Sequence, residues 1–276
     1  MDLILAAHGT RKPGGVAMVG DLAAQVSALL DRRVQVAFAD LLGPTPSEVL
    51  SRVAASGRPA VVVPAFLSRG YHVRTDLPAH VTDSAHPNVK VAPALGPSGE
   101  IARIVADQLA KAGWRLGDSV ILGAAGTTDS HARADLHITA TTLSALVGSR
   151  VRLGFAATGD PSVDDAVAAA RRGGARRVVV ASYLLADGLF QQRLRASGAD
   201  LVSRPLGTHP GLARLIANRF RRAVPRLVPV TTRRASCRPS RRRAQAPHSL
   251  SNSMEHDALS ASPAFSAKRH AEGRDA

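Results

Sequence analysis

Three residues whose side chains bind metals or carry protons each follow a short apolar run of the sequence. His8 follows the first run, in AAHGTR; Asp40 follows the second, in AFADLLGP; and His72 lies in SRGYH, after the third. Two imidazoles and one carboxylate suit a divalent ion such as Fe, Co, Ni or Zn, and so small a ligand set leaves coordination positions open. An aspartate before a loop also commonly caps a turn, so Asp40 has a structural alternative.

The apolar runs alternate with segments of helical pattern, and this order predicts where the three residues lie. Strands that alternate with helices form βαβ units and a parallel sheet, and the continuous apolar character of VVVPAF and VVVASYLL is typical of strands covered on both faces. Ligands bind beyond the carboxyl ends of such strands, so the three side chains are expected at one sheet edge. In the first part of the chain we expect strands at 3–7, 34–39, 60–66 and 89–92, and helices at 16–30, 47–55 and 99–111.

The sequence also repeats itself, with an offset of 117 residues. LILAAHGT at 3–10 matches VILGAAGT at 120–127, and VVV at 61–63 matches VVV at 178–180. We therefore expect two tandem doubly wound α/β domains that face each other, and a monomer whose domains pair within one chain. The predicted domains are 1–112, which holds the three residues, and 118–227, a degenerate copy.

The second copy lacks all three of the candidate metal-binding residues. Their counterparts are apolar: Ala125 for His8, Ala157 for Asp40, and Leu189 or Phe190 for His72, depending on a one-residue gap near Gly188. The neighbouring Gly9-Thr10 nevertheless persists as Gly126-Thr127. Joint loss of three unrelated residues would be a coincidence, so the pattern favours one functional unit in the first copy.

The composition limits the class of protein. Of the 276 residues, 45% are hydrophobic, 3% are aromatic and one is cysteine, which predicts a core of Ala, Val and Leu and excludes a disulfide scaffold. The longest apolar runs, at 60–67 and 178–186, are about half as long as a membrane-spanning helix. The N-terminus does not have the pattern of a signal peptide. We therefore expect a cytoplasmic protein with no membrane partner.

The net charge of +15 predicts an anionic partner. Residues 228–276 hold nine Lys or Arg and four Asp or Glu without periodicity, which indicates a disordered basic tail that supplies +5 of this charge. A nucleic-acid-binding protein is one alternative. Residues 1–227 offer neither an aromatic stacking platform nor a known recognition motif, so any such binding is expected to be non-specific and to involve the tail.

Two motifs resemble those of a known family. AAHGTR and PAFLSRGYHVRTDLP are similar to motifs of the sirohydrochlorin chelatases, members of the class II chelatase group, and the duplication over residues 1–227 resembles the family's two-copy form. The resemblance implies insertion of Fe²⁺ or Co²⁺ into sirohydrochlorin for sirohaem or cobalamin biosynthesis. The metal is then a substrate, with no permanently bound cofactor. His8 and His72 match the family's two active-site histidines, and Asp40 stands where many members have glutamate.

The same resemblance implies roles for individual side chains. His8 and His72 would bind the metal and help accept the protons that leave the macrocycle, and Asp40 would offset the charge of the cation. Sirohydrochlorin carries many carboxylates, and four basic residues flank the two motifs and can pair with them: Arg11, Lys12, Arg69 and Arg74. A non-catalytic carrier of the tetrapyrrole or of the metal is the alternative function, because it would use the same residues.

Overall fold

The computed structural model describes residues 1–10, 12–207 and 209–224. Within them the chain forms two sheets of four strands each, and every neighbouring pair of strands is parallel. This confirms the predicted fold class, two tandem doubly wound α/β repeats. The predicted tail at 228–276 lies outside the described residues, as does Arg11.

The first sheet has the strand order β2-β1-β3-β4. Its strands are β1 (Asp2–Ala7), β2 (Val34–Phe38), β3 (Ala60–Pro64) and β4 (Val89–Val91). The helical segments of this repeat are α1 (Pro13–Leu30), α2 (Pro46–Ala54), a π-helical turn η1 (His72–Asp76), α3 (Leu77–Asp83) and α4 (Gly99–Ala112). The predicted bounds agree with these because the apolar runs and the turn residues between them mark the ends of each element.

The second sheet repeats this order as β6-β5-β7-β8. Its strands are β5 (Ser119–Ala124), β6 (Arg152–Phe155), β7 (Val178–Tyr183) and β8 (Leu201–Val202). Its helices are α5 (Ser130–Val147), α6 (Val163–Arg172), α7 (Leu189–Ala196) and α8 (Pro210–Ala223).

The strand register refines the alignment of the two repeats. Leu3 pairs with Val61 in the first sheet, whereas its counterpart Val120 pairs with Val179 in the second. The offset is therefore 117 up to β6, 118 at β7 and 111 at β8, where Leu201 pairs with Val179 as Lys90 pairs with Val61. The predicted match of 61–63 with 178–180 is displaced by one residue, because the second repeat has one more residue between β6 and β7.

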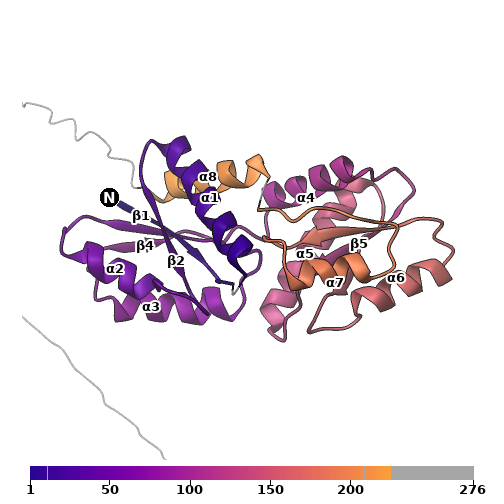
Figure 1. Cartoon of the computed structure of the whole chain (residues 1–276), viewed down its shortest axis with the longest axis horizontal. Coiled ribbons are helices and arrows are strands. Elements are labelled where there is room, and N and C mark those ends of the chain that lie inside the picture. The colour runs from indigo at the N-terminus through magenta and orange to yellow at the C-terminus, as the bar shows by residue number, and fades with distance from the viewer. Residues whose placement is uncertain (11, 208, 225–276) are drawn as a thin grey trace, which may run out of the picture. The chain divides into compact units, whose positions relative to one another are not determined.

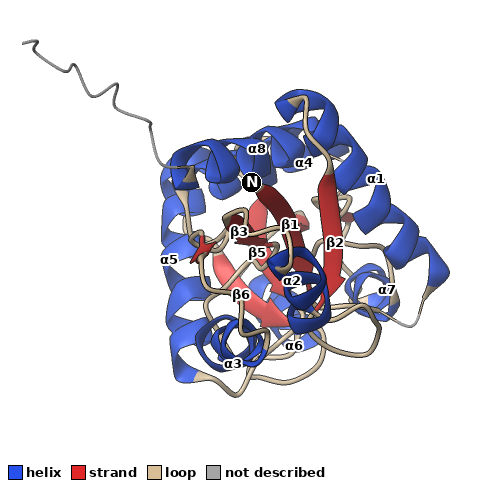
Figure 2. Cartoon of the chain, turned by 90° about the vertical axis from the view of Figure 1, so that its left-hand side faces the viewer, coloured by secondary structure: helices blue, strands red, loops and turns tan. Residues whose placement is uncertain are grey.

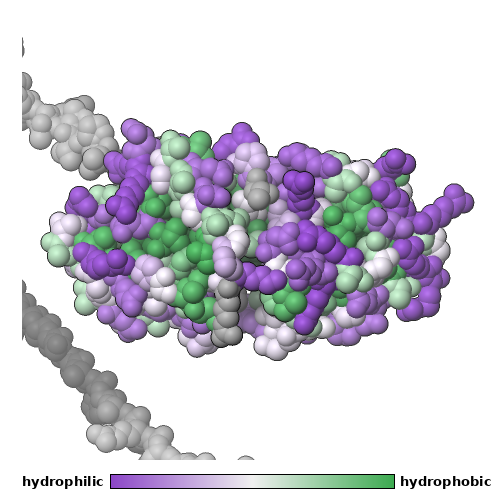
Figure 3. Space-filling view, in the orientation of Figure 1, coloured by the Kyte–Doolittle hydropathy of each residue, from purple (hydrophilic) through white to green (hydrophobic). Residues whose placement is uncertain are grey.

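Helices cover both faces of each sheet (Figure 2). Successive side chains of a strand point to opposite faces, so Leu3 and Leu5 of β1 lie in the core shared with α1 and α8, while Ile4 and Ala6 lie in a second core with α2 and α3. Hydrophilic side chains gather over α7 in the view of Figure 3, and this helix buries only two of its residues, Gln191 and Leu194.

The last helix of each repeat packs on the sheet of the other repeat. Helix α4 contacts α5, β7 and β8, and α8 contacts α1 and β3. Figure 1 shows α8, in orange, beside α1, in indigo. One apolar core results that runs through both repeats and includes Leu22 of α1, Ile101 of α4, Leu143 of α5 and Phe220 of α8. A repeat of the sequence is therefore not a separate unit of packing.

Of the helices in the described part of the chain, α1 alone has the length and composition of a membrane span. Its Val19, Leu22 and Val26 lie in the core, and the helix contacts β2 and α8. Packing within the fold thus accounts for these apolar residues of the helix.

Candidate active site

His8 and Asp40 lie side by side because they follow neighbouring strands. The pairing of β1 with β2 continues beyond the strand ends, where the N–H of Ala39 donates to the carbonyl of Ala7 and the N–H of Asp40 donates to the carbonyl of His8. The chain then turns at Gly9, whose φ is +96°. A Cβ at Gly9 would lie 2.1 Å from the carbonyl oxygen of Asp40, so only glycine permits this approach.

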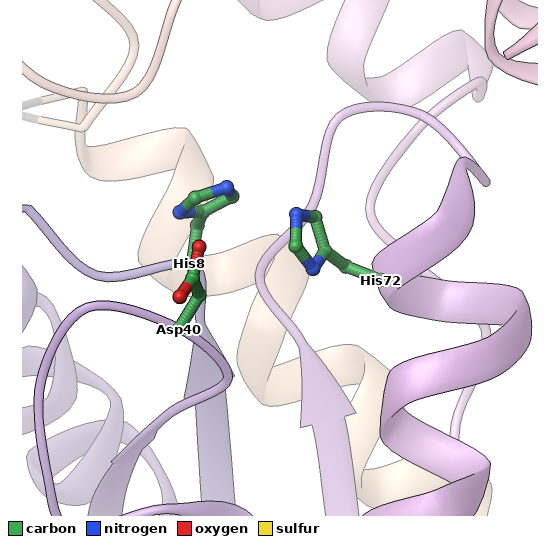
Figure 4. A group of neighbouring side chains, drawn as sticks. All are labelled: His8, Asp40 and His72. Carbon is green, nitrogen blue, oxygen red and sulfur yellow. The ribbon is translucent and has the colours of Figure 1, made fainter.

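His72 reaches the same edge from the other side of β1. It begins η1, shortly after β3, and β3 pairs with β1 on the side opposite β2. The ring centroids of His8 and His72 are 4.4 Å apart, with the rings at 75° to each other. One ligand atom from each of His8, Asp40 and His72 lies within 4.8 Å of the other two. Figure 4 shows the three side chains together at this edge. The structure thus brings together the three residues that the sequence singled out.

Asp76 contacts a candidate metal ligand, and the sequence reasoning missed it. Its Oδ2 lies 2.5 Å from Nδ1 of His72. Because an ionised carboxylate only accepts hydrogen bonds, Nδ1 of the neutral imidazole donates and Nε2 keeps its lone pair for a metal. The ring of Phe66 stacks against His72 at 6.0 Å and further fixes its orientation. The motif HVRTD held the signal, since a carboxylate four residues after a histidine can meet it in a helical turn.

Asp40 has the structural role that was considered for it. Its Oδ1 accepts a hydrogen bond of 2.7 Å from the N–H of Leu41, whose φ is +67°. This bond caps the turn after β2 and does not use Oδ2, so the role of Asp40 as a metal ligand stays a prediction.

The surroundings lower the pKa of His8 below its ordinary value. The main cause is that protein replaces water around part of the ring, although His8 remains open to solvent on the cavity side, and the neighbouring His72 lowers the pKa further. Asp40 raises the pKa and offsets part of this effect. His8 is therefore neutral near pH 7, which is the form that binds a metal.

Two of the three residues, His8 and His72, line a cavity of about 910 Å³ to which both repeats contribute. The second repeat contributes the counterparts of all three, Ala125, Ala157 and Phe190, and the offset of 118 makes Phe190, not Leu189, the counterpart of His72. Four large apolar side chains that line this cavity are between 40% and 58% exposed: Leu41, Tyr71, Leu189 and Phe190.

The flanking basic residues have different surroundings. Lys12 lines the cavity, and Arg74 contacts His131 in the first turn of α5. The guanidinium of Arg69 is paired with the buried carboxylate of Asp135, at 2.6 Å. The guanidinium of Arg69 thus already has a carboxylate partner within the protein, and its pairing with a substrate carboxylate stays a prediction.

Comparison with known proteins supports the resemblance seen in the two motifs. The family model CbiX matches the chain twice, at residues 2–112 and 119–223. The curated sirohydrochlorin cobaltochelatase of Methanopyrus kandleri is 37% identical over 78 residues, which are 28% of this chain and 54% of that protein. The match thus spans about half the length of this relative.

Solved structures share the fold over both repeats. SirB from Bacillus subtilis with Fe³⁺ has a TM-score of 0.70 and 20% identity, with 81% of this chain and 96% of that chain covered. The sirohydrochlorin chelatase SirB from Bacillus subtilis subspecies spizizenii in complex with cobalt has a TM-score of 0.66 and 19% identity, with 81% and 95% covered. The two matches of the family model cover nearly all of both repeats and include both motifs. The chain therefore belongs to the CbiX family.

Proposed function

We propose that this protein inserts a divalent metal, Fe²⁺ or Co²⁺, into sirohydrochlorin. The observation that carries the proposal is the group of ligand atoms of His8, Asp40 and His72, within 4.8 Å of one another at the wall of an open cavity. A cavity of this size is within the range of ligand sites in proteins. The family and the relatives named sirohydrochlorin chelatases support the same activity.

The ligand set suits a metal that is delivered and not kept. Imidazole binds both iron and cobalt, and a single carboxylate offsets part of their charge. With three protein ligands, the remaining positions are free for the pyrrole nitrogens of the incoming macrocycle. Each protein ligand is then displaced as the metal moves into the ring.

The protons balance in this exchange. The macrocycle loses two pyrrole protons when it takes up the divalent ion, and the departing metal frees the imidazole lone pairs of His8 and His72. Each imidazole can accept one proton and pass it to water, with Asp40 stabilising the charged rings. The lowered pKa of His8 favours its return to the neutral form, which is ready for the next ion.

The cavity also offers what the rest of the macrocycle needs. Tyr71 and Leu41 of the first repeat and Leu189 and Phe190 of the second present apolar surface to a flat ring. We propose Lys12 and Arg74 as partners of its carboxylates, since both lie beside the metal-binding residues in the sequence and Lys12 lines the cavity. We further propose that the chain acts in the cytoplasm as a monomer, whose two repeats supply the two walls of one site.

Metallation of sirohydrochlorin, followed by absorption spectroscopy with Co²⁺ and with Fe²⁺, tests this proposal. The protein is expected to accelerate the reaction at least about a hundredfold over the spontaneous rate, as general acid–base catalysis does. The ratio of the two rates gives the metal preference. A rate equal to the spontaneous one, together with tight binding of tetrapyrrole or metal, would establish the carrier function instead.

Replacing Asp76 with alanine is expected to weaken Co²⁺ binding by about ten- to a hundredfold, because His72 then loses the partner that fixes its ring and its tautomer. The affinity is measured by titration of the apoprotein with Co²⁺. Replacement of Asp83, an acidic residue of α3 outside the ligand group, provides the control and should leave the affinity unchanged. Equal affinities of the Asp76→Ala and wild-type proteins would remove Asp76 from the site.

A further inference from the structure

We propose that the second repeat positions His72 by holding the loop that precedes it, with Asp135 as the principal positioning residue. The loop is held by a loop anchor, which consists of Asp135, Thr139 and Tyr183. The inference rests on the proposed function in that it concerns the same metal-binding group. It assigns a role to the repeat that carries none of the three metal-binding side chains.

The carboxylate of Asp135 binds the loop through both the backbone N–H and the side chain of Arg69. The N–H of Arg69 donates to Oδ2 of Asp135 at 2.6 Å, and Nη2 of Arg69 donates to Oδ1 at 2.6 Å. The side chain of Asp135 is only 2% exposed. A buried carboxylate requires its partners, and removing one of them is costly, so the position of Arg69 is strongly fixed relative to α5.

Tyr183 holds the same loop two residues earlier. Its hydroxyl donates to the carbonyl of Leu67 at 2.8 Å, and burial raises the pKa of this phenol, which therefore stays protonated. Thr139 joins the two contacts, because its hydroxyl donates to the carbonyl of Asp135 at 3.0 Å and lies 3.3 Å from the hydroxyl of Tyr183.

The loop also has little room to move. A Cβ at Gly70 would lie 3.3 Å from Cβ of Ala132 on α5, and one at Gly96 would lie 2.2 Å from the carbonyl oxygen of Leu67 and 2.5 Å from the hydroxyl of Tyr183. The loop is thus packed between the second repeat and the Gly96 turn of its own repeat.

The held segment leads directly to His72. The carbonyl of Gly70 accepts hydrogen bonds from the N–H groups of Val73 and Arg74, which form the first turn around His72. A displacement of residues 67–70 therefore moves the imidazole relative to His8 and Asp40. Metal ligands need their geometry fixed by surrounding groups, and for His72 part of this support comes from the other repeat.

The comparison of the repeats argues that this contact serves the site and not the fold in general. By the offsets of 117 and 118, the counterparts of the loop anchor are side chains without hydrogen-bonding polar groups: Met18 for Asp135, Leu22 for Thr139 and Ala65 for Tyr183. Beside Gly207, the counterpart of Gly96, the thioether of Met18 takes the place that the hydroxyl of Tyr183 has beside Gly96. Of the two equivalent contacts between the repeats, only the one that holds the loop before His72 thus has the polar residues of the loop anchor.

The test compares Asp135→Asn with Asp118→Asn in the full-length protein. Asp118 is a matched control in the same repeat: it is 8% exposed, and its Oδ2 accepts from the N–H of Arg115 and from the guanidinium of Arg177, both at 2.8 Å. Both variants should lose thermal stability. Asp135→Asn is expected to weaken Co²⁺ binding about tenfold and to change the visible spectrum of bound Co²⁺, while Asp118→Asn stays within about twofold of wild type. Equal Co²⁺ affinities of the two variants would overturn the proposal.

Two further measurements keep the inference separate from the proposed function. Tyr183→Phe removes the bond to Leu67 without leaving a buried charge, and should weaken Co²⁺ binding in the same direction if Asp135→Asn does not fold. NMR spectra of the His72 imidazole need no metal, and should show more than one ring environment in Asp135→Asn but one in Asp118→Asn. A single, wild-type environment in Asp135→Asn would refute the positioning role, whereas absence of Co²⁺ binding by the wild-type protein would refute the proposed function alone.

Discussion

Replacing His8 or His72 with alanine is expected to have the largest effect on activity of any single change. Each variant should slow metallation of sirohydrochlorin by about a hundredfold or more, since it loses both a metal ligand and a proton acceptor. Their two rings are 4.4 Å apart and act on one ion in the proposed mechanism, so the double variant should be little slower than either single one. Initial rates of metallation with saturating Co²⁺ provide the measurement.

The matched control for these variants is His80→Ala. His80 lies in α3, where its Nδ1 is 3.2 Å from the hydroxyl of Ser47, and it is not part of the ligand group. Its removal should leave the rate unchanged. Turnover close to that of the wild type in both His8→Ala and His72→Ala would be incompatible with the proposed mechanism.

The second large effect is expected at Gly9, and the second repeat supplies the control. Gly9 and Gly126 have φ values of +96° and +113°, and a Cβ would lie 2.1 Å from the carbonyl oxygen of Asp40 in one and 2.0 Å from that of Thr158 in the other. Alanine at either position should therefore lower the free energy of unfolding by about 1–3 kcal/mol. Denaturant titrations of the two variants measure this loss.

Only the Gly9→Ala variant should also bind Co²⁺ more weakly. The added methyl group separates the turn after β1 from Asp40, and so moves His8 away from its neighbour, with an expected loss of Co²⁺ affinity of more than about tenfold. Gly126→Ala strains a turn that carries Ala125 in place of a ligand. The interpretation fails if the two variants bind Co²⁺ equally well.

Much of the site was predictable because it depends on short-range pattern and on strand topology. The apolar runs place His8, Asp40 and His72 after parallel strands, and parallel strands end at one edge of a sheet. The order β2-β1-β3 then puts them together. The repeat added a second argument. The second copy has the apolar residues Ala125 and Ala157 in place of His8 and Asp40, and this joint replacement singled out the first copy's residues as one functional unit.

What could not be predicted depends on partners far apart in the chain. An apolar face on α4 or α8 shows that the helix is buried, but not that it is buried on the other repeat's sheet. Arg69 lies beside the motif that holds His72, and only the fold reveals that Asp135, 66 residues later, neutralises it. The sequence left two choices for the counterpart of His72, Leu189 or Phe190, because it suggested a one-residue gap near Gly188. The strand register places this gap before β7.

The exchange of α4 and α8 has a mechanical consequence. Each helix ties the repeat it belongs to into the core of the other, with Ile101 and Phe220 completely or almost completely buried. To widen the space between the two walls, both helices would have to leave a core that is continuous across the molecule. The distance between the two walls is thus fixed when the protein folds, before any ligand binds. In the proposed function, a flat macrocycle would therefore enter a preformed space, with no closing motion of the two repeats.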